Sequence, residues 1–348
     1  MAQHLPKENG ALDLKKLSSL VSVALFASTS LLHAQDIQTF DVKSRFIENF
    51  RIGSNDKQFG PLQFVGGLEM IGSSSDFGAI SGIALAEDQL KFVAVADTGF
   101  WIHGKIERDE NNNPTGLTDV SMSEITGKSG APISEKWQAD AEGIIVDDES
   151  ITVSFERAHR IANYTTQSGQ VPQLENEFSP PVPLYELRAN AGFEGIALAP
   201  ETAPFAGALV GISEKSLDKN KNTMGFVQAQ NGDSFEFSVN RKDEFNITDL
   251  AFLPDGNLII LERRFNVSDG IGMRLRHIKA ADVKQGATVD GQTLMEADFL
   301  YQIDNMEGLT ITSDDDGTPR LTLVSDDNHS LLQRNLLLEF RLTGSIAD

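Results

Sequence analysis

The sequence contains no cysteine among its 348 residues, so disulfide bonds, thiolate catalysis and Cys-ligated zinc are excluded. Basic residues are scarce as well: 29 Lys and Arg stand against 51 Asp and Glu, a formal net charge of −22. This balance argues against a nucleic acid partner and favours a soluble, anionic surface or cation binding. The sequence also has no G-x-S-x-G nucleophile elbow, H-E-x-x-H zinc motif, P-loop or dinucleotide fingerprint.

Long apolar runs are missing except near the N-terminus, where Lys15 and Lys16 precede LSSLVSVALFASTSLLHA. That stretch is short and rich in serine for a membrane span, and it ends in the small residue Ala34. This pattern is typical of a secretory signal peptide. We predict a signal peptide over residues 1–34, one domain over residues 35–348, a periplasmic or secreted location, and no membrane association after cleavage. A buried N-terminal helix is the alternative.

An acid-Gly-aliphatic motif recurs along the chain, at the start of short apolar runs. Its copies are Ser81-Gly82-Ile83, Glu142-Gly143-Ile144, Glu194-Gly195-Ile196, Thr248-Asp249-Leu250 and Glu307-Gly308-Leu309. After each copy come a turn rich in Asp, Pro or Gly and a second β-type run. These second runs end in Asp97, Glu156, Glu214, Glu262 and Asp326. Short β-type runs that repeat every ~40–60 residues indicate a β-propeller.

We therefore predict an all-β chain that forms a β-propeller, with six blades of antiparallel strands around a central channel; five or seven blades are also open. The segment from Phe50 to Gly72 would complete the sixth blade with the strand from Leu336 to Leu342. The N- and C-terminal strands would thereby close the ring and remove the exposed edge. A large β-sandwich is the alternative. Residues 104–136 are expected to form a long loop or hairpin insertion, and residues 265–298 an elaborated surface region.

The recurring acids are predicted to meet at one mouth of the channel. In an antiparallel hairpin the start of the first strand lies beside the end of the second, which makes Glu142 and Glu156 neighbours. So many carboxylates repel one another unless cations bind between them, and their hard oxygen ligands suit Ca²⁺ better than zinc. The predicted metal ligands are Asp97, Glu142, Glu194, Glu214, Asp249, Glu307 and Asp326. The alternative for each acid is a structural role, as a cap or an ion-pair partner.

Basic residues follow several of these acids and are predicted to bind an anionic substrate. This set is Arg157, Arg160, Lys215, Arg263 and Arg264. Arginine matches phosphate oxygens with two parallel donors, whereas simple surface ion pairing would contribute little. His159 and His329 each come three positions after an acid that ends a strand, so either could donate a proton or bind metal. The predicted catalytic groups are Glu156, Glu262, His159 and His329.

The motifs FGAISGIAL, DAEGIIV, ITVSFERAHRI, GFEGIAL, ITDLAFLPDGNLIILERRF and NMEGLTI together resemble the bacterial phytase-like family, also labelled "esterase-like activity of phytase". The resemblance runs from about Phe64 to Leu342. It implies an exported propeller and, through a more distant analogy to calcium-dependent propeller phytases, hydrolysis of phosphate esters. Since Ser81 replaces the motif acid, its blade is expected to contribute fewer ligands.

We therefore expect a Ca²⁺-dependent phosphoesterase that acts on a small anionic substrate at the channel mouth, as a monomer. A lactonase- or carboxylesterase-type hydrolase and a non-catalytic periplasmic binding propeller are the alternatives.

Overall fold

The structure is a computed structural model that describes Met1 and residues 37–167, 169–182, 192–266 and 270–346. The chain divides into two units, Met1–Ala34 and Gln35–Asp348. The predicted signal peptide, residues 1–34, lies outside the described residues apart from Met1. Within the described part of the chain, no helix combines the length and apolar character needed to cross a bilayer.

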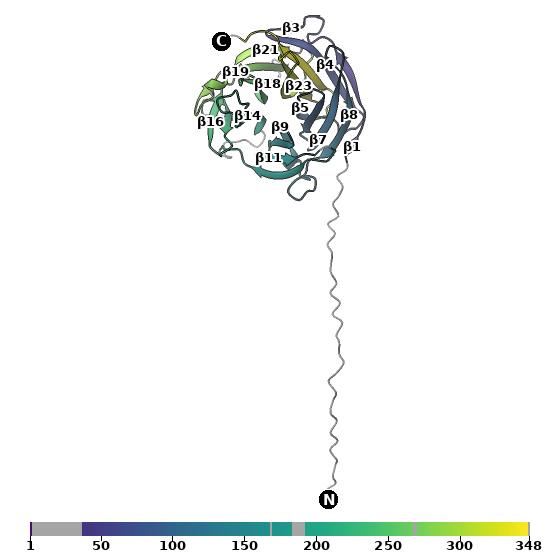
Figure 1. Ribbon diagram of the computed structural model, residues 1–348, viewed down its shortest axis with the longest axis vertical. Coiled ribbons are helices and arrows are strands. Elements are labelled where there is room, and N and C mark those ends of the chain that lie inside the picture. Colours follow the sequence, from purple (N-terminus) through teal and green to yellow (C-terminus); the bar gives the residue numbers. More distant parts are fainter. Residues whose placement is uncertain (2–36, 168, 183–191, 267–269, 347–348) are drawn as a thin grey trace. The chain divides into compact units, whose positions relative to one another are not determined.

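The described residues of the second unit form five β-sheets arranged around a central axis, as the blades of a propeller (Figure 1). Blade 1 contains β5 (Ile80–Leu85), β6 (Lys91–Ala96), β7 (Phe100–Arg108), β8 (Pro114–Glu124) and β1 (Gln38–Thr39). Blade 2 contains β9 (Ala141–Asp147), β10 (Ser150–Phe155), β11 (Arg160–Thr165) and β12 (Gln173–Phe178). The four-residue helix α1 (Lys136–Ala139) connects these two blades.

Blade 3 contains β13 (Phe193–Leu198), β14 (Leu209–Leu217), β15 (Thr223–Gln228), β16 (Ser234–Val239) and β20 (Thr288–Val289), which joins β16 in parallel. Blade 4 contains β17 (Asn246–Phe252), β18 (Leu258–Asn266), β19 (Gly270–Ile278) and β21 (Gln292–Asp298). The 3-10 turn η2 (Ala280–Asp282) follows β19. Blade 5 contains β22 (Asn305–Ser313), β23 (Pro319–Asp326), β24 (Asn335–Leu342), β4 (Leu62–Gly72) and β2 (Val42–Ile47), with β3 (Gln58–Phe59) paired to β4. In each blade the first motif-bearing strand is innermost.

The β-propeller prediction is confirmed, but the prediction of six blades is wrong. The N-terminal strand β4 does pair with the C-terminal strand β24, for example at Gly67 opposite Leu338. However, β24 also pairs with β23, so these strands complete the fifth blade instead of building another one. The last repeat supplies only three strands of its own, and the N-terminal strands fill the remaining places.

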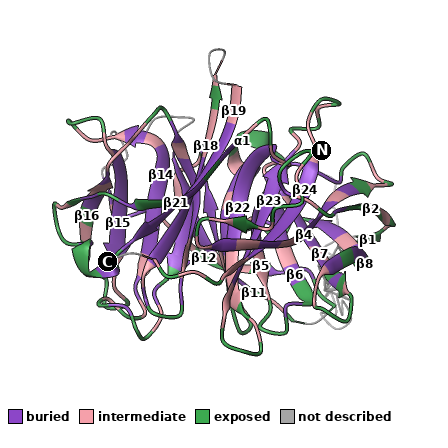
Figure 2. Cartoon of the chain, turned by 90° about the horizontal axis from the view of Figure 1, so that it is seen from above, coloured by how far each residue is buried: buried purple, intermediate pink, exposed green. Residues whose placement is uncertain are grey.

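The two segments predicted as insertions or surface elaborations provide outer strands of the blades. Residues 104–136 include most of the β7–β8 hairpin, and residues 265–298 include β19 and β21. In β8 the polar residues alternate with buried ones, as in a strand with one side toward solvent, whereas the polar residues Arg274 and Arg276 of β19 are buried and paired with Glu262. Figure 2 shows the buried residues concentrated within and between the sheets and the exposed ones on the connecting loops.

The glycine of the repeated motif allows neighbouring inner strands to approach closely. A Cβ atom placed on Gly82 would lie 2.2 Å from the carbonyl oxygen of Glu142, and one on Gly143 would lie 2.4 Å from that of Glu194. Blade 4 has Asp249 at this position instead. Its carboxylate accepts hydrogen bonds from the backbone N–H groups of Leu250 (2.8 Å) and Leu309 (2.7 Å), and thus links blades 4 and 5.

Candidate active site at one mouth of the channel

The blade hairpins bring two polar positions together at the end where the inner strands begin. In blade 2 the N–H of Glu156 donates to the carbonyl of Asp140 at 3.0 Å, just beyond the ladder of β9 and β10. In blade 3 the N–H of Glu214 donates to the carbonyl of Gly192 at 3.0 Å. The end of each second strand thus lies beside the start of its inner strand, which places its side chain next to the motif acid.

These positions surround a pocket of about 210 Å³. It is lined by Ser81, Asp97, Asp140, Glu142, Glu156, Arg157, Glu194, Glu214, Lys215, Arg263, Glu307, Asp326 and Asn328. Eight of these side chains are carboxylates and three are cationic, an excess of five negative charges if all are ionised. We refer to this site as the acidic pocket.

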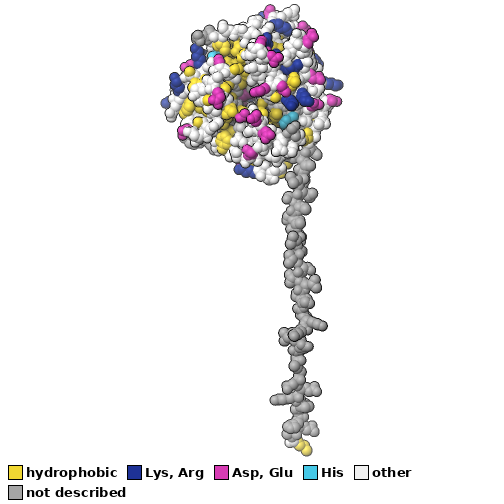
Figure 3. Space-filling view, in the orientation of Figure 1, with side chains coloured by type: hydrophobic (Ala, Val, Ile, Leu, Met, Phe, Trp, Pro, Cys, Tyr) yellow, Lys and Arg dark blue, Asp and Glu magenta, His cyan; other side chains and the backbone are white. Residues whose placement is uncertain are grey.

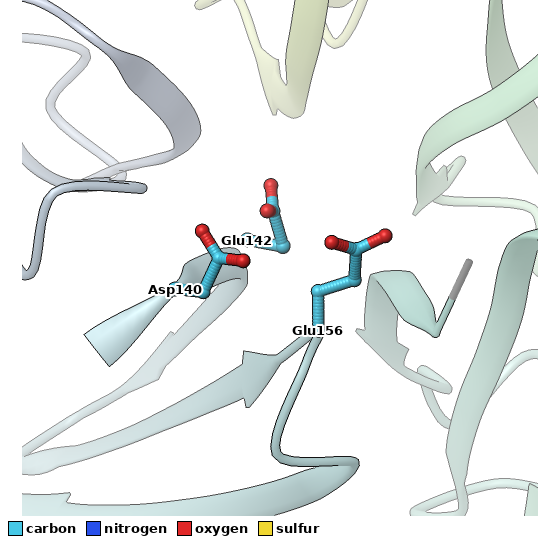
Figure 4. A group of neighbouring side chains, drawn as sticks. All are labelled: Asp140, Glu142 and Glu156. Atoms are coloured by element: carbon cyan, nitrogen blue, oxygen red, sulfur yellow. The ribbon is translucent and has the colours of Figure 1, made fainter. Parts of the chain in front are cut away.

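Two groups of carboxylates in the acidic pocket are close enough to share an ion. Asp140, Glu142 and Glu156 each offer an oxygen within 4.8 Å of the others, and Figure 4 shows these three side chains directed toward a common space. Glu156 also belongs to a second group of the same dimensions, with Glu194 and Glu214. Glu156 therefore connects the two groups.

Removal from water and mutual repulsion disfavour the ionised forms of these acids. Burial, followed by the proximity of Glu307, raises the pKa of Glu142 well above its ordinary value. Burial, followed by the proximity of Glu214, does the same to the pKa of Glu194. Burial is likewise the main cause that raises the pKa of Asp140 to about 6, of Glu156 and Asp326 each to about 7, and of Glu307 to about 8.

The donor set fits a hard divalent cation. Glu194 is 5% exposed and its Oε2 atom has no hydrogen-bond partner among the described residues, although it lines the acidic pocket. Asp97 Oδ1 is also buried without such a partner. A buried, unpaired carboxylate oxygen is costly unless a cation or proton compensates it. All-oxygen ligands suit Ca²⁺, and the two groups of carboxylates that share Glu156 are the residues that could hold it.

The three cationic side chains of the acidic pocket occupy different depths. Arg157 contacts Asp140 (Nε to Oδ2, 2.8 Å) with 44% of its side chain exposed, and Lys215 contacts Glu214 with 45% exposed. Arg263 lies deeper, with 24% exposed, and its Nη1 atom lies 2.9 Å from Glu307 Oε1. Arg157 and Lys215 are therefore the rim cations that an incoming anion meets first.

Glu262 does not lie in the acidic pocket, contrary to its predicted catalytic role. It is 1% exposed and forms ion pairs at 2.6 Å with both Arg274 and Arg276. The predicted alignment was displaced by one residue in blade 4, because Arg263 and not Glu262 pairs opposite the first residue of the inner strand. A shift of one residue in a strand directs the side chain to the other face. Glu262 thus has a structural role, as the buried ion-pair partner of Arg274 and Arg276.

Several other predicted site residues also lie outside the acidic pocket. Asp249 is engaged by backbone N–H groups between blades 4 and 5. The guanidinium of Arg160 lies 3.9 Å from the ring centre of Phe155, and that of Arg264 lies 4.5 Å from the ring centre of Phe245. These arginines pack against the blades and do not line the pocket.

The two predicted catalytic histidines are not among the lining residues either. His159 is half-buried, and burial lowers its pKa. His329 is exposed and lies near enough to Asp97 to oppose, through its positive charge, the burial-driven rise in the pKa of that carboxyl.

The sequence patterns missed two contributors to the acidic pocket. Asp140 stands two positions before Glu142, at the residue that ends α1 and precedes β9, and its side chain is directed toward the same space as that of Glu142 (Figure 4). Their spacing was the signal present in DAEGI. Asn328 follows Asp326 in the β23–β24 connection and donates its N–H to Asp326 Oδ1 at 2.6 Å, which the motif spacing could not show. Ser81 lines the pocket with a hydroxyl, consistent with the expectation of fewer ligands from blade 1.

A larger hollow of about 620 Å³ lies at the opposite ends of the inner strands. Its walls are mostly aliphatic, including Ile144, Ile196 and Leu250, and its acidic residues are Glu87 and Asp147. Figure 3, which looks along the channel, shows hydrophobic and acidic side chains around the centre of the face in view. A polar reaction needs charged groups, and the acidic pocket offers many more of them than this aliphatic hollow does.

Comparison with known proteins identifies a family for this chain. The model of the phytase-like family, described as "Esterase-like activity of phytase", matches residues 75–329. A search among curated proteins gave no significant match.

Among solved structures, a protein of unknown function from Desulfotomaculum acetoxidans is 11% identical (TM-score 0.36; 74% of this chain and 72% of that chain covered). Glutaminyl cyclase of Myxococcus xanthus is 12% identical (TM-score 0.42; 80% and 96% covered), and a glucose dehydrogenase is 11% identical (TM-score 0.41; 80% and 98% covered). Similarities this low carry no functional argument.

Proposed function

Because the chain belongs to the phytase-like family described as esterase-like activity of phytase, we propose that it is an exported, Ca²⁺-dependent hydrolase of phosphate esters that acts at the acidic pocket. The observation that carries the proposal is the convergence of eight carboxylates from four blades, including the buried Glu194 oxygen that has no partner among the described residues. Buried carboxylates without compensating positive charge destabilise a fold, and a bound divalent cation would supply that charge.

In this proposal the residues of the pocket have two roles, cation binding and substrate binding. Asp140, Glu142, Glu156 and Glu194 would hold the cation. When bound, Ca²⁺ polarises a phosphoryl group and lowers the pKa of a water molecule. The rim cations Arg157 and Lys215 would contact phosphate oxygens and orient the ester.

Asp326 is placed to deliver a proton to the leaving group. Burial raises its pKa to about 7, so it holds a proton in a large fraction of molecules at neutral pH. Its Oδ1 atom accepts the N–H of Asn328, which leaves Oδ2, 3.4 Å from Asn305 Nδ2, as the atom that would carry the proton. Asp326→Asn would keep the shape of the side chain and remove this function.

The test is phosphate release from a panel of phosphate esters, including phytate and an aryl phosphate, with Ca²⁺ and with chelator. We expect release that depends on Ca²⁺, is abolished by chelator and is restored by added Ca²⁺. Glu142→Gln should abolish it, whereas Asp147→Asn, an exposed acid at the other end of β9, should not. Absence of release across the panel at saturating Ca²⁺ would refute the proposal. Export is tested separately: the periplasmic or secreted protein should begin near Gln35.

A second function, hydrolysis of a carboxylic ester or lactone, is favoured by one observation. Arg263 is engaged by Glu214 and Glu307, and Arg160 and Arg264 lie outside the pocket, so among the described residues that line it the rim cations Arg157 and Lys215 are left to meet an anion. Replacing both rim cations, as Arg157→Met and Lys215→Met, separates the two functions. Loss of phosphate-ester turnover with lactone turnover retained supports the first. A Ca²⁺-dependent rise in Tm without any turnover would instead indicate a binding propeller.

A further inference from the structure

One blade departs from the acidic pattern of the ring. The second strand of every other blade carries a carboxylate at the pocket, either within the strand or directly after it, namely Asp97, Glu156, Glu214 and Asp326. The equivalent residue of blade 4 is Arg263, which pairs opposite Asn246 as Asp326 pairs opposite Asn305. The inner strand of blade 4 likewise carries Thr248 where blades 2, 3 and 5 carry glutamate. Blade 4 thus contributes a cation where its neighbours contribute anions.

The two terminal nitrogens of Arg263 contact Glu307, Asn305 and Glu214, whereas its Nε has no hydrogen-bond partner among the described residues. Its Nη1 atom lies 2.9 Å from Glu307 Oε1 and also donates to the side-chain oxygen of Asn305. Its Nη2 atom lies 3.4 Å from Glu214 Oε1, which Lys215 also contacts. The half of the pocket formed by blades 4 and 5 and the end of β14 therefore already contains its positive charge.

The other half has acids in excess of cations. Glu142 and Glu156 form no ion pair among the described residues, and Glu194 Oε2 has no hydrogen-bond partner there. Asp140 has only the half-exposed Arg157. Asp140, Glu142 and Glu156 each offer an oxygen within 4.8 Å of the others, and Glu194 is in the same relation to Glu156 and Glu214. Since Glu214 is already shared by Lys215 and Arg263, Glu194 is the ligand that the second group can add to the first. Asp97, whose Oδ1 is also unpartnered among the described residues, belongs to neither group.

We propose that the acidic pocket holds a single divalent cation, bound by Asp140, Glu142, Glu156 and Glu194, and that Arg263 takes the place of a second cation as the fixed counter-ion of Glu214 and Glu307. Two like charges a few ångströms apart at low dielectric repel strongly, so the guanidinium excludes a second ion from its half of the pocket. This inference rests on the metal binding assumed in the proposed function and adds the number of ions and the residue that sets it.

Metal stoichiometry tests the inference. Calorimetric titration of the chelated protein with Ca²⁺, and luminescence titration with Tb³⁺, should give one site per chain in the wild type. Arg263→Met keeps most of the length of the side chain and removes its charge, so the stoichiometry should rise to two. Arg264→Met is the matched control, because it removes the neighbouring charge of the same strand outside the pocket, and it should leave one site.

Two sites in the wild type, or one site of unchanged affinity in Arg263→Met, would overturn the inference. If Arg263→Met does not fold, Glu142→Gln is the deciding variant. A single site predicts that this variant loses Ca²⁺ affinity at least tenfold and retains no other site. A remaining site of unchanged affinity would contradict the inference. The outcome is separable from that of the proposed function. One bound ion without any turnover refutes the hydrolase and leaves the inference standing, and chelator-sensitive turnover with two bound ions does the reverse.

Discussion

Without metal, the acidic pocket should make the protein less stable as the pH rises. Burial, then the proximity of Asp140 and Glu214, raises the pKa of Glu156 from 4.5 to about 7 in the folded protein. The folded state therefore holds the proton more tightly than the unfolded state. The resulting stabilisation is fully present below pH 4.5 and is lost as the pH rises through about 7.

The size of this effect follows from the difference between the two pKa values. One pH unit corresponds to about 1.4 kcal/mol, so Glu156 alone should reduce the free energy of unfolding by about 2 to 3 kcal/mol between pH 5 and pH 8. Glu156→Gln removes the titrating group and keeps the shape. In chelator, the variant should lose about 2 to 3 kcal/mol less than the wild type over this range, and at pH 8 it should be the more stable protein.

Urea denaturation at pH 5, 6, 7 and 8, with chelator throughout, measures the effect. Burial lowers the pKa of His103, His159 and His277, which gives stability that is lost as the pH falls through 6.5, but this contribution is common to both proteins and cancels in their difference. Addition of Ca²⁺ at pH 8 should stabilise the wild type and leave the variant nearly unchanged. A wild type whose stability is constant or increases between pH 5 and pH 8 relative to the variant would refute the reasoning.

Two further predictions concern the frame around the pocket. Gly143→Ala places a Cβ atom 2.4 Å from the carbonyl oxygen of Glu194, so we expect about 1–3 kcal/mol of destabilisation in denaturant melts, whereas Gly127→Ala, where the nearest atom is 3.5 Å away, should change little. An equal effect of both substitutions would contradict a close contact of the inner strands. Glu262→Gln leaves Arg274 and Arg276 without their buried carboxylate, with an expected loss of about 3–5 kcal/mol and unchanged Ca²⁺ stoichiometry. Loss of metal binding in a folded Glu262→Gln protein would contradict the structural role and indicate that Glu262 takes part in metal binding.

The repeated motif was sufficient to predict the inner strands and the mouth at which their acids meet. Glu142 lies beside Glu156, and Glu194 beside Glu214, because hairpin geometry fixes which strand ends are adjacent, a local property that sequence spacing records. The two pairs meet because the inner strands β9 and β13 pack side by side. The pairing of the N-terminal segment with the strand ending at Leu342 was also readable, as two apolar runs without other partners.

The remaining errors arise where one residue of register or a distant contact decides the outcome. The sequence LERR offers an acid and a base side by side, and only the ladder of β17 and β18 shows that Arg263 faces the pocket while Glu262 faces the blade interior. Asp249 appeared as a ligand because its place in the motif coincides with the glycine layer, where a carboxylate can bridge two strands instead. The blade count depended on whether the terminal strands share a sheet with β22 and β23, which spacing does not reveal.

The seam between β4 and β24 joins positions about 270 residues apart, such as Gly67 and Leu338. Contacts of such long range are slow to form, because two distant parts of the chain must meet against the entropy of the segment between them. During synthesis, β24 is the strand that joins β23 to β4 and so closes the propeller. The acidic pocket, which is built from several blades, is therefore complete only after β24 has been made. Removal of β24 alone would thus prevent Glu142 and Glu194, which lie far from it along the chain, from taking their places in the acidic pocket.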